Sequence, residues 1–187
     1  MKNKLALWLG MMFLCVTLMA QNSLNLIPIP QQMTEAGGSF VMGKVMLETP
    51  VWQDQWQKFV ADAGGMIVPK SSRKIEVKLV PEVQGAKLNQ EEAYRLVVSS
   101  KGVLVEATTE KGVYWALQTL RQLLPSAIES NECKLDVVWE VPAIRVIDEP
   151  RFGYRGLMVD VARHFITKDH LLQIIDTMGM LKLNKLH

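Results

Sequence analysis

Charged side chains suited to a polar binding site are concentrated in one run of the chain, DEPRFGYRGLMVDVARHF, from Asp148 to Phe165. The residues between the charged positions favour a strand. The charged positions are Arg151, Arg155, Asp160, Arg163 and His164. A charge is costly to bury unless a partner compensates it, so such a strand more often builds a polar site than a plain apolar core. The run therefore predicts a strand that contributes to a binding site.

The elements that position this run form a predicted strand–helix–strand unit. Arg155–Val161 reads as a strand, and Thr167 is the expected N-cap of a helix with Asp169 in its first turn. The helix is expected to present an apolar stripe of Leu171, Leu172, Ile175 and Met178 and to end at Gly179 as its C-cap. A second strand is expected to begin in Leu181–His187. His170, in the first turn, is expected to face solvent. Two strands joined in this way lie parallel.

The run resembles a known family signature. Pro150-Arg151-Phe152, Tyr154-Arg155-Gly156 and the stretch Leu157–Phe165 are similar to the first barrel strand of glycoside hydrolase family 20, the β-N-acetylhexosaminidases. The resemblance implies a (β/α)8 TIM barrel, whose active site lies at the carboxyl ends of the strands. Asp160, Arg163 and His164 fall at that end of the first strand.

Within this resemblance, Arg155 matches an arginine described in the family as holding hydroxyls of the terminal N-acetylhexosamine. A guanidinium suits that task because its fork of N–H donors bridges two adjacent hydroxyls. Arg155 and Asp160 are an odd number of positions apart, so in a regular strand they face opposite sides unless a bulge intervenes. Arg155 is the first candidate for substrate binding, followed by Asp160 and by His187, which opens a further family motif. Arg163 and His164 are assigned to a structural network of charges near the site.

The catalytic carboxylates of the family are expected beyond His187. Family 20 uses the 2-acetamido oxygen of the substrate as nucleophile, with an Asp-Glu pair after the fourth barrel strand. The pairs Glu91-Glu92 and Asp148-Glu149 belong to the preceding domain or its exit and are rejected as substitutes. The resemblance thus predicts an enzyme, but the 187-residue chain is expected to be inactive by itself. No metal site and no cofactor is expected.

The residues before the run predict a separate domain with strands and helices. Helices are expected around Trp52–Ala63, stopped by Gly64-Gly65, and over Glu110–Leu124, stopped by Pro125. Expected strands are Phe40–Leu47, Ile75–Leu79, Tyr94–Val98, Val103–Val105, Leu135–Trp139 and Ala143–Ile147, with a hairpin turn at 99–102. This composition predicts a mostly antiparallel sheet with two helices on one face.

The segment EAYRLVVSSKGVLVEATTEKGVYWALQTLRQLL, from Glu92 to Leu124, resembles the accessory domain that precedes the family 20 barrel. The predicted fold class is therefore α+β: a signal peptide over 1–20, an accessory domain over 21–148, and the truncated start of a (β/α)8 barrel over 149–187. Four aromatic residues, Trp52, Trp56, Tyr114 and Trp115, admit either a sugar-stacking platform or a helical core. Their helical spacing favours the core.

The first twenty residues have the pattern of a secretory signal peptide. Lys2 and Lys4 precede the apolar stretch Leu5–Leu18, and cleavage is expected after Ala20. The stretch is shorter than the ~20 residues that span a bilayer, so stable membrane insertion is not expected. Cys15 lacks the small residues before a lipidated cysteine, which argues against a lipid anchor. The protein is predicted to be secreted or periplasmic.

Charge and cysteine content exclude other classes of function. Without Lys2 and Lys4 the basic and acidic side chains are equal in number, so no overall field attracts nucleic acid. Cys133 is then the only cysteine, which excludes an intramolecular disulfide and a zinc-ligand spacing. The predicted partner is a glycan with a terminal β-linked N-acetylhexosamine. Two alternatives are a non-catalytic carbohydrate-binding or structural remnant, and a different barrel glycosidase with the same accessory domain.

Overall fold

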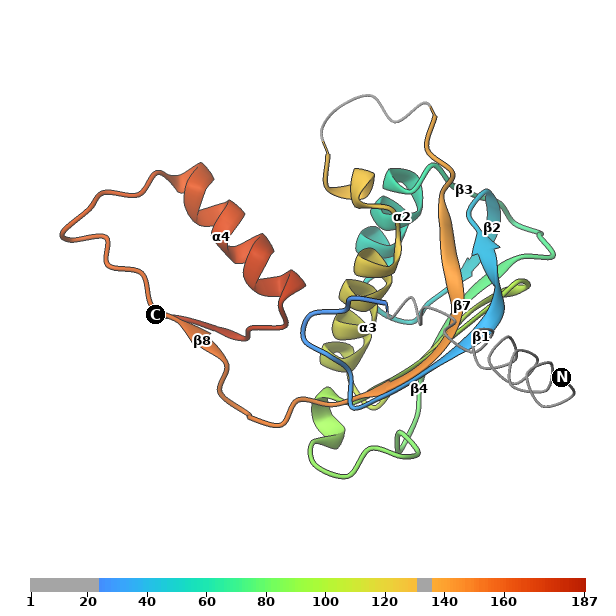
Figure 1. The fold of residues 1–187 in the computed structure, drawn as a ribbon, viewed down its shortest axis with the longest axis horizontal. Helices are drawn as coiled ribbons and strands as arrows, with labels where there is room; N and C mark the ends of the chain where they lie inside the picture. Colours follow the sequence, from blue (N-terminus) through green and yellow to red (C-terminus); the bar gives the residue numbers. More distant parts are fainter. Residues whose placement is uncertain (1–23, 131–135) are drawn as a thin grey trace, which may run out of the picture.

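The computed structural model describes residues 24–130 and 136–187, as a sheet-and-helix domain followed by a smaller strand–helix–strand unit (Figure 1). The predicted signal peptide and Cys133 lie outside the described residues. The same holds for Leu135, the first residue of the strand expected over Leu135–Trp139. Among the helices that are described, none is long and apolar enough to cross a membrane.

The domain is built on a seven-stranded sheet in the order β1-β7-β5-β6-β4-β2-β3. The strand bounds are β1 Gln32–Val41, β2 Lys44–Glu48, β3 Met66–Ile67, β4 Lys74–Leu79, β5 Tyr94–Ser99, β6 Gly102–Ala107 and β7 Glu140–Asp148. The β1–β7–β5–β6 half is antiparallel and the β6–β4–β2–β3 half is parallel. The prediction of a mostly antiparallel sheet was therefore wrong for the second half. The helix α2 returns the chain between the parallel strands β2 and β3, and β6 runs parallel to β4 because β5, which lies between them in sequence, runs opposite to both.

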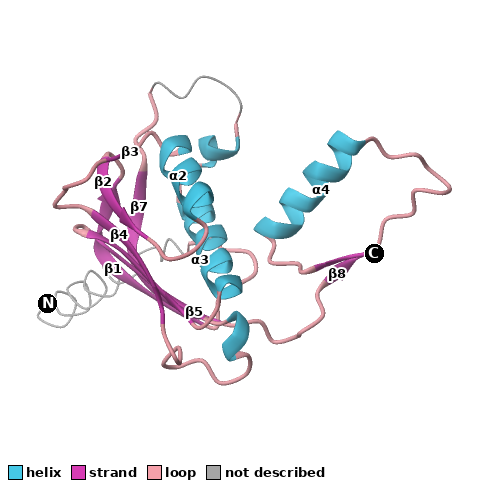
Figure 2. Cartoon of the chain, turned by 180° about the vertical axis from the view of Figure 1, so that it is seen from behind, coloured by secondary structure: helices cyan, strands magenta, loops and turns pink. Residues whose placement is uncertain are grey.

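Two helices cover one face of the sheet, as the sequence predicted (Figure 2). They are α2, Gln53–Asp62, and α3, Glu110–Leu123, which Thr109 caps by accepting a hydrogen bond from the Lys111 amide. The apolar positions of these helices pack on alternating residues of the strands. The largest fully buried side chains include Trp56, Tyr94, Phe40, Ile75, Leu96, Leu120 and Ile144.

The aromatic side chains of the two helices belong to this core. Trp56 is fully buried and Trp115 nearly so, while Trp52 and Tyr114 are partly buried against the same cluster. The four residues therefore pack in the protein interior and do not form an open stacking platform.

Three predicted strands differ in their bounds. The strand expected over 40–47 is split between β1 and β2 at Met42-Gly43, where the Met42 amide donates to the Trp139 carbonyl. Residues 136–139 form no strand, whereas 143–147 is the middle of β7. The strand β7 contains Pro142, which pairs with Ser39 of β1. The pairing of β7 with β5 begins only at Ile144, so the missing N–H of Pro142 breaks no hydrogen bond to β5.

The second unit is formed by β8, Gly156–Leu157, α4, Lys168–Met180, and β9, Lys185–Leu186. The parallel pairing of β8 with β9 and the Thr167 N-cap agree with the prediction. The strands are shorter than expected, since only two residues of each find a partner in this pairing. Gly179 is not a C-cap but lies inside α4 against Tyr114, and the left-handed residue after the helix is Lys182.

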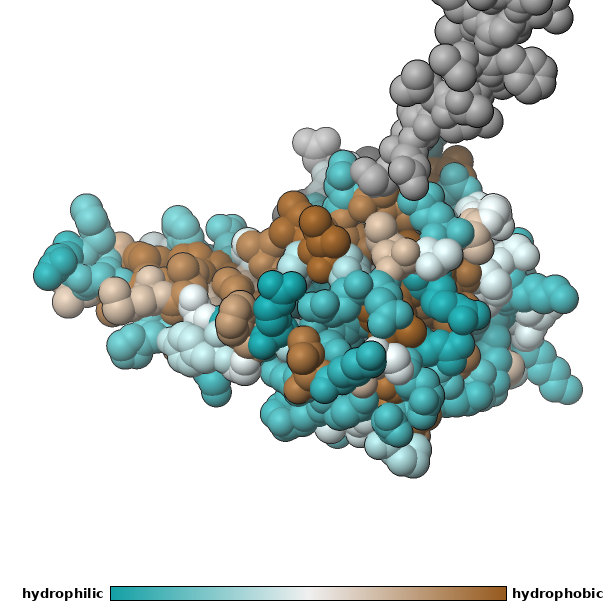
Figure 3. All heavy atoms as spheres, turned by 60° about the horizontal axis from the view of Figure 1, so that its bottom comes forward, coloured by the Kyte–Doolittle hydropathy of each residue, from teal (hydrophilic) through white to brown (hydrophobic). Residues whose placement is uncertain are grey.

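Apolar side chains gather on this second unit where it extends from the sheet domain (Figure 3). Phe165 is 87% exposed and Met158 70%, and in the predicted helix stripe Leu172 and Ile175 are also exposed, whereas Met178 is buried. On the side of the sheet domain, an ion pair of 2.9 Å between Arg121 and Asp176 joins α3 to α4.

The close contact of α3 with the segment before β5 gives a test of the fold. A Cβ at Gly112 would lie 2.2 Å from the backbone oxygen of Ala93, whereas a Cβ at Gly37 meets nothing within 4 Å. We expect Gly112→Ala to lower the free energy of unfolding by about 1–3 kcal/mol through overpacking, and Gly37→Ala to change it by less than about 0.5 kcal/mol. Urea unfolding followed by tryptophan fluorescence measures both; equal stabilities would contradict the packing described.

Candidate functional site

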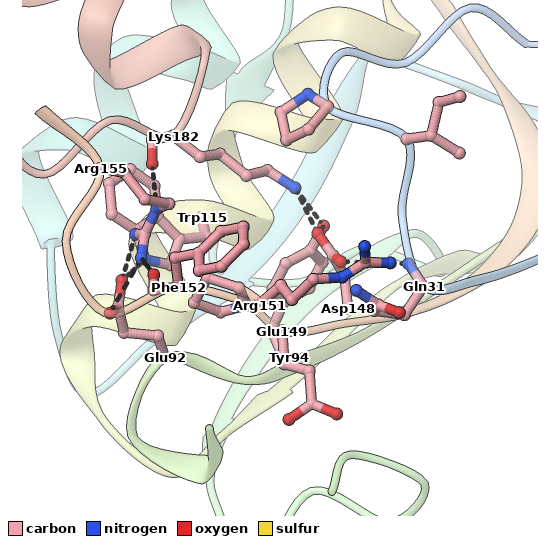
Figure 4. Close-up of a pocket in the computed structure, with 13 residues that line it drawn as sticks. Gln31, Glu92, Tyr94, Trp115, Asp148, Glu149, Arg151, Phe152, Arg155 and Lys182 are labelled. Atoms are coloured by element: carbon pink, nitrogen blue, oxygen red, sulfur yellow. Dashed lines mark hydrogen bonds and ion pairs between the residues drawn. The ribbon is translucent and has the colours of Figure 1, made fainter. Parts of the chain in front are cut away.

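A cavity of about 300 Å³ lies where the sheet domain meets the strand–helix–strand unit (Figure 4). Its walls combine acidic side chains of the domain with basic side chains of the unit and several apolar residues. The lining includes Glu92, Tyr94, Trp115, Asp148, Glu149, Arg151, Phe152, Arg155 and Lys182. We call this boundary between the sheet domain and the strand–helix–strand unit the seam. Two buried ion pairs cross it, Glu92–Arg155 and Asp148–Lys182.

The first ion pair joins Glu92 to Arg155 in a forked arrangement. The distance from Arg155 Nη2 to Glu92 Oε2 is 2.5 Å, and Nη1 lies 3.3 Å from Oε1. The side chains are only 14% and 8% exposed. Trp115 adds an indole N–H donated to Glu92 at 2.8 Å, and its ring lies 5.5 Å from the guanidinium carbon. The pair is therefore shielded from water, and Trp115 helps to orient both partners: its N–H donates to the carboxylate and its ring packs against the guanidinium.

The environment of Glu92 keeps its carboxylate ionised. Burial alone would raise the pKa of Glu92, but the hydrogen bonds from Arg155 and Trp115 outweigh it and lower the pKa below its ordinary value. Asn89 also helps to hold this carboxylate, because its side chain accepts from the Glu92 amide and donates to the Glu92 carboxylate.

The remaining donors of Arg155 are directed at the backbone of its own unit. Nε donates to the Lys182 carbonyl and Nη1 to the Phe152 carbonyl, each at 2.7 Å. With Glu92, these contacts engage four of the five guanidinium N–H groups. Arg155 precedes β8, so it lies at the amino end of that strand and faces the sheet domain.

The second ion pair joins Asp148, the last residue of β7, to Lys182 at 2.7 Å. Tyr94 lies between them, donating to Asp148 at 3.1 Å and accepting from Lys182 at 2.7 Å. Burial lowers the pKa of Lys182, against the opposing effect of Asp148, and burial together with the Asp148 charge raises the pKa of Tyr94 well above its ordinary value. The tyrosine therefore stays protonated as a donor.

Glu149, next to Asp148, has a different partner. Its carboxylate accepts three backbone N–H groups, from Lys87, Leu88 and Asn89, at 2.6 Å each. Burial would raise the pKa of Glu149, but these three hydrogen bonds outweigh it and lower the pKa. Asp148 and Glu149 thus hold the end of β7 to its surroundings.

The other predicted site residues lie away from this cavity, beyond the carboxyl ends of β8 and β9. Asp160 accepts backbone N–H groups of Ala162 and Arg163 at 2.9 and 3.1 Å, and the Val159 amide donates to the His187 carbonyl at 2.8 Å. The structure therefore brings Asp160, Arg163 and His187 to one end of the unit and places Arg155 at the other. The argument from strand alternation does not apply, because β8 ends at Leu157.

The structural network assigned to Arg163 and His164 does not form among the described residues. Arg163 is 90% exposed and pairs with Asp160 within its own loop at 3.5 Å, and His164 is exposed as well. Both follow the last residue of β8 that pairs with β9, so they lie outside the β8–β9 ladder. His170 is exposed, as expected.

Of the four side chains in the two ion pairs, the sequence assigns only Arg155 to the site: Glu92 and Asp148 belong to the carboxylate pairs rejected as catalytic, and Lys182 is not assigned. The spacing of Asn89 and Glu92 resembles a helix capping box and was a usable local signal for Glu92. No local signal marks Lys182. Within the described ranges, no cluster of three or more His, Cys, Asp or Glu side chains is arranged to hold a metal ion.

Two family models match the chain in succession. The model described as glycosyl hydrolase family 20, domain 2, matches residues 23–149, and the model for the glycosyl hydrolase family 20 catalytic domain matches residues 152–187. A β-hexosaminidase of Porphyromonas gingivalis is 32% identical over 175 residues, which is 88% of this chain and 22% of that protein. A β-N-acetylhexosaminidase of Cellulomonas fimi is 41% identical over 126 residues, which is 63% of this chain and 24% of that protein.

Solved structures show the same similarity. The family 20 β-N-acetylhexosaminidase of Streptomyces coelicolor A3(2) has a TM-score of 0.72 and 27% identity, over 87% of this chain and 34% of that one. A mutant Streptomyces plicatus β-hexosaminidase in complex with its product, GlcNAc, has a TM-score of 0.70 and 27% identity, over 87% and 33%. The chain thus spans about a third or less of the length of these relatives.

The three amide hydrogen bonds to Glu149 predict a pH-dependent stability. Because its pKa is lowered on folding, Glu149 stabilises the fold above the ordinary carboxyl pKa of 4.5 and loses that contribution as the pH falls through the folded value. We expect Glu149→Gln to lower the free energy of unfolding at pH 7 by about 1.5–3 kcal/mol. The difference from the unsubstituted chain should shrink below pH 4.5, as measured by urea unfolding from pH 7 to 3; a constant difference would contradict this account.

Proposed function

This chain belongs to glycosyl hydrolase family 20, and from that membership we propose that it forms the accessory domain and the first strand–helix–strand unit of a β-N-acetylhexosaminidase. The observation that carries the proposal is the succession of the two family matches, with a parallel β8–β9 pair inside the second. A parallel strand pair bridged by a helix is the repeating unit of a (β/α)8 barrel, so we place β8 and β9 as its first two strands.

The proposed reaction removes a terminal N-acetylglucosamine or N-acetylgalactosamine by retaining, substrate-assisted hydrolysis. The 2-acetamido oxygen of the sugar attacks C1 as the glycosidic oxygen leaves with a proton from a general acid, and water then opens the cyclic intermediate. Residues 151–187 contain no glutamate, so we place the Asp-Glu pair of this mechanism outside the present sequence.

The part of this chain proposed to meet the sugar is the carboxyl end of β8 and β9. Asp160 and His187 lie there, and the side chain of Asp160 is 41% exposed, so it is accessible to sugar hydroxyls. The assignment of Arg155 to hydroxyl binding stays a prediction. Its engagement with Glu92 and with two backbone carbonyls supports a role in holding β8 instead.

We also propose that the protein is exported, to the periplasm or the medium, without a lipid anchor. This proposal depends on the pattern of residues 1–20: two lysines, an apolar stretch and a small residue at the expected cleavage position, Ala20.

The activity has a direct test. The protein expressed from its complete reading frame is expected to hydrolyse an aryl N-acetyl-β-glucosaminide at least about 100-fold faster than the corresponding aryl β-glucoside, which lacks the intramolecular nucleophile. Activity should be found in the periplasmic extract or the medium. Equal hydrolysis of both substrates would contradict substrate assistance, and a folded protein that binds the sugar but turns over neither would favour a non-catalytic carbohydrate-binding protein.

Asp160 gives a residue-level test of the proposed sugar contact. Asp160→Asn keeps an oxygen that accepts the Ala162 and Arg163 amides but loses the charge offered to a hydroxyl. We expect kcat/KM for the aryl N-acetyl-β-glucosaminide to fall about 10- to 100-fold, as for a charged hydrogen bond worth about 1.5–3 kcal/mol. Asp169→Asn, an exposed change in the first turn of α4, is the matched control. Equal values for the two variants would remove Asp160 from the site.

A further inference from the structure

The two buried ion pairs of the seam share one arrangement. In each, the carboxylate comes from the sheet domain, Glu92 or Asp148, and the cation comes from the residues just before a strand of the second unit. Arg155 immediately precedes β8, and Lys182 precedes β9 by a few residues. The sheet domain therefore contacts the amino ends of both strands with charged, oriented groups.

The two anchor points are also fastened to each other. The Asn184 side chain accepts the Arg155 amide at 3.0 Å and donates to the Gly153 carbonyl at 2.9 Å, while the Asn184 amide donates to the Arg155 carbonyl at 2.8 Å. Arg155 Nε donates to the Lys182 carbonyl at 2.7 Å. A displacement of either cation would therefore displace the start of both strands.

The distance from these anchors to the opposite end of the strands is short. β8 and β9 pair over two residues each, and the next ladder bonds join His187 to Leu157 and Val159 to His187 at 2.9 and 2.8 Å. At about 3.3 Å per residue, only a few residues separate Arg155 and Lys182 from Val159 and His187. Since a hydrogen-bonded strand pair moves as a unit, the orientation of the amino ends sets that of the carboxyl ends.

Stability alone does not account for the use of charges at the seam. A buried ion pair is often no more stabilising than well-packed apolar residues of similar volume, because desolvation offsets the attraction. A forked guanidinium–carboxylate pair does, however, fix the orientation of its partners. The Glu92–Arg155 pair is of this forked kind, and the Asp148–Lys182 pair adds a second point of attachment.

We propose that Glu92 and Asp148 are positioning residues for the hydrolase: they set the placement of the first two barrel strands, and through them the sugar-binding end that carries Asp160 and His187. This inference rests on the proposed hexosaminidase function. Neither carboxylate is near the bound sugar in this scheme, since both hold the opposite end of the strands. Their effect on turnover is transmitted through the β8–β9 pair.

The test uses the protein expressed from its complete reading frame. Glu92→Gln and Asp148→Asn are compared with Glu91→Gln and Glu140→Gln, which remove exposed carboxylates of the same domain. We expect kcat per folded molecule, measured well below the unfolding temperature, to fall at least about 10-fold in the first two variants, because small misplacements at a reacting centre are costly. The controls should stay within about two-fold. Hydrogen exchange at the Val159 and His187 amides should accelerate only in the first two.

A double variant separates positioning from stabilisation. Asp148→Asn with Lys182→Met removes both charges; the asparagine oxygen can still accept from the Gln31 amide, and its NH2 group can donate to the Tyr94 hydroxyl, which no longer accepts from Lys182. We expect its unfolding temperature to stay within a few degrees of the unsubstituted protein, while kcat per folded molecule falls as in Asp148→Asn. Unchanged kcat in all folded variants, with unchanged exchange at Val159 and His187, would overturn the inference. An inactive unsubstituted protein would instead overturn the proposed function, and the exchange measurement would still decide on positioning.

Discussion

The structure depends on the pairing of buried charges at the seam between the sheet domain and the unit that follows it. Glu92, Arg155, Asp148 and Lys182 all lose most of their contact with water, and none of these charges is tolerable there without its partner. Each carboxylate is therefore matched to one cation of the second unit. Tyr94 and Trp115, which hydrogen-bond to the same carboxylates, tie this constraint to the core of the sheet domain.

That constraint gives the two ends of the strand–helix–strand unit different characters. The amino ends of β8 and β9 are buried, paired and hydrogen-bonded to the domain before them. The carboxyl ends carry exposed polar groups, Asp160, Arg163 and His187, beside exposed apolar side chains such as Phe165. In the (β/α)8 barrel that we propose, the first end would belong to the face that supplies stability and the second to the face that supplies chemistry. The sheet domain contacts the first of these ends, where the two buried ion pairs lie.

Much of the local structure follows from local rules, which is why it could be predicted. The helix α3 has its apolar face at regular spacing and Thr109 at its start, and β5 and β6 alternate around a short turn. The differences arise where a distant contact decides. Gly179 reads as a helix end but lies inside α4, because its missing side chain makes room for Tyr114 of α3. The strand expected from Ala143 begins earlier, at Glu140, because Pro142 lies before the first residue of β7 that pairs with β5.

The sequence by itself determined the family, the order of the two parts and the residues able to carry charge into a strand, because these depend on residue type and on spacing along the chain. It did not determine what those charges face. Arg155 has the donor geometry for two sugar hydroxyls and equally for one carboxylate, and only the fold brings Glu92 within 2.5 Å of it. Likewise, Lys182 and Asp148 are far apart in sequence and meet because β7 and the turn after α4 end at the same place. Pairing across such distances depends on how the two parts dock, and docking is a property of the tertiary structure alone.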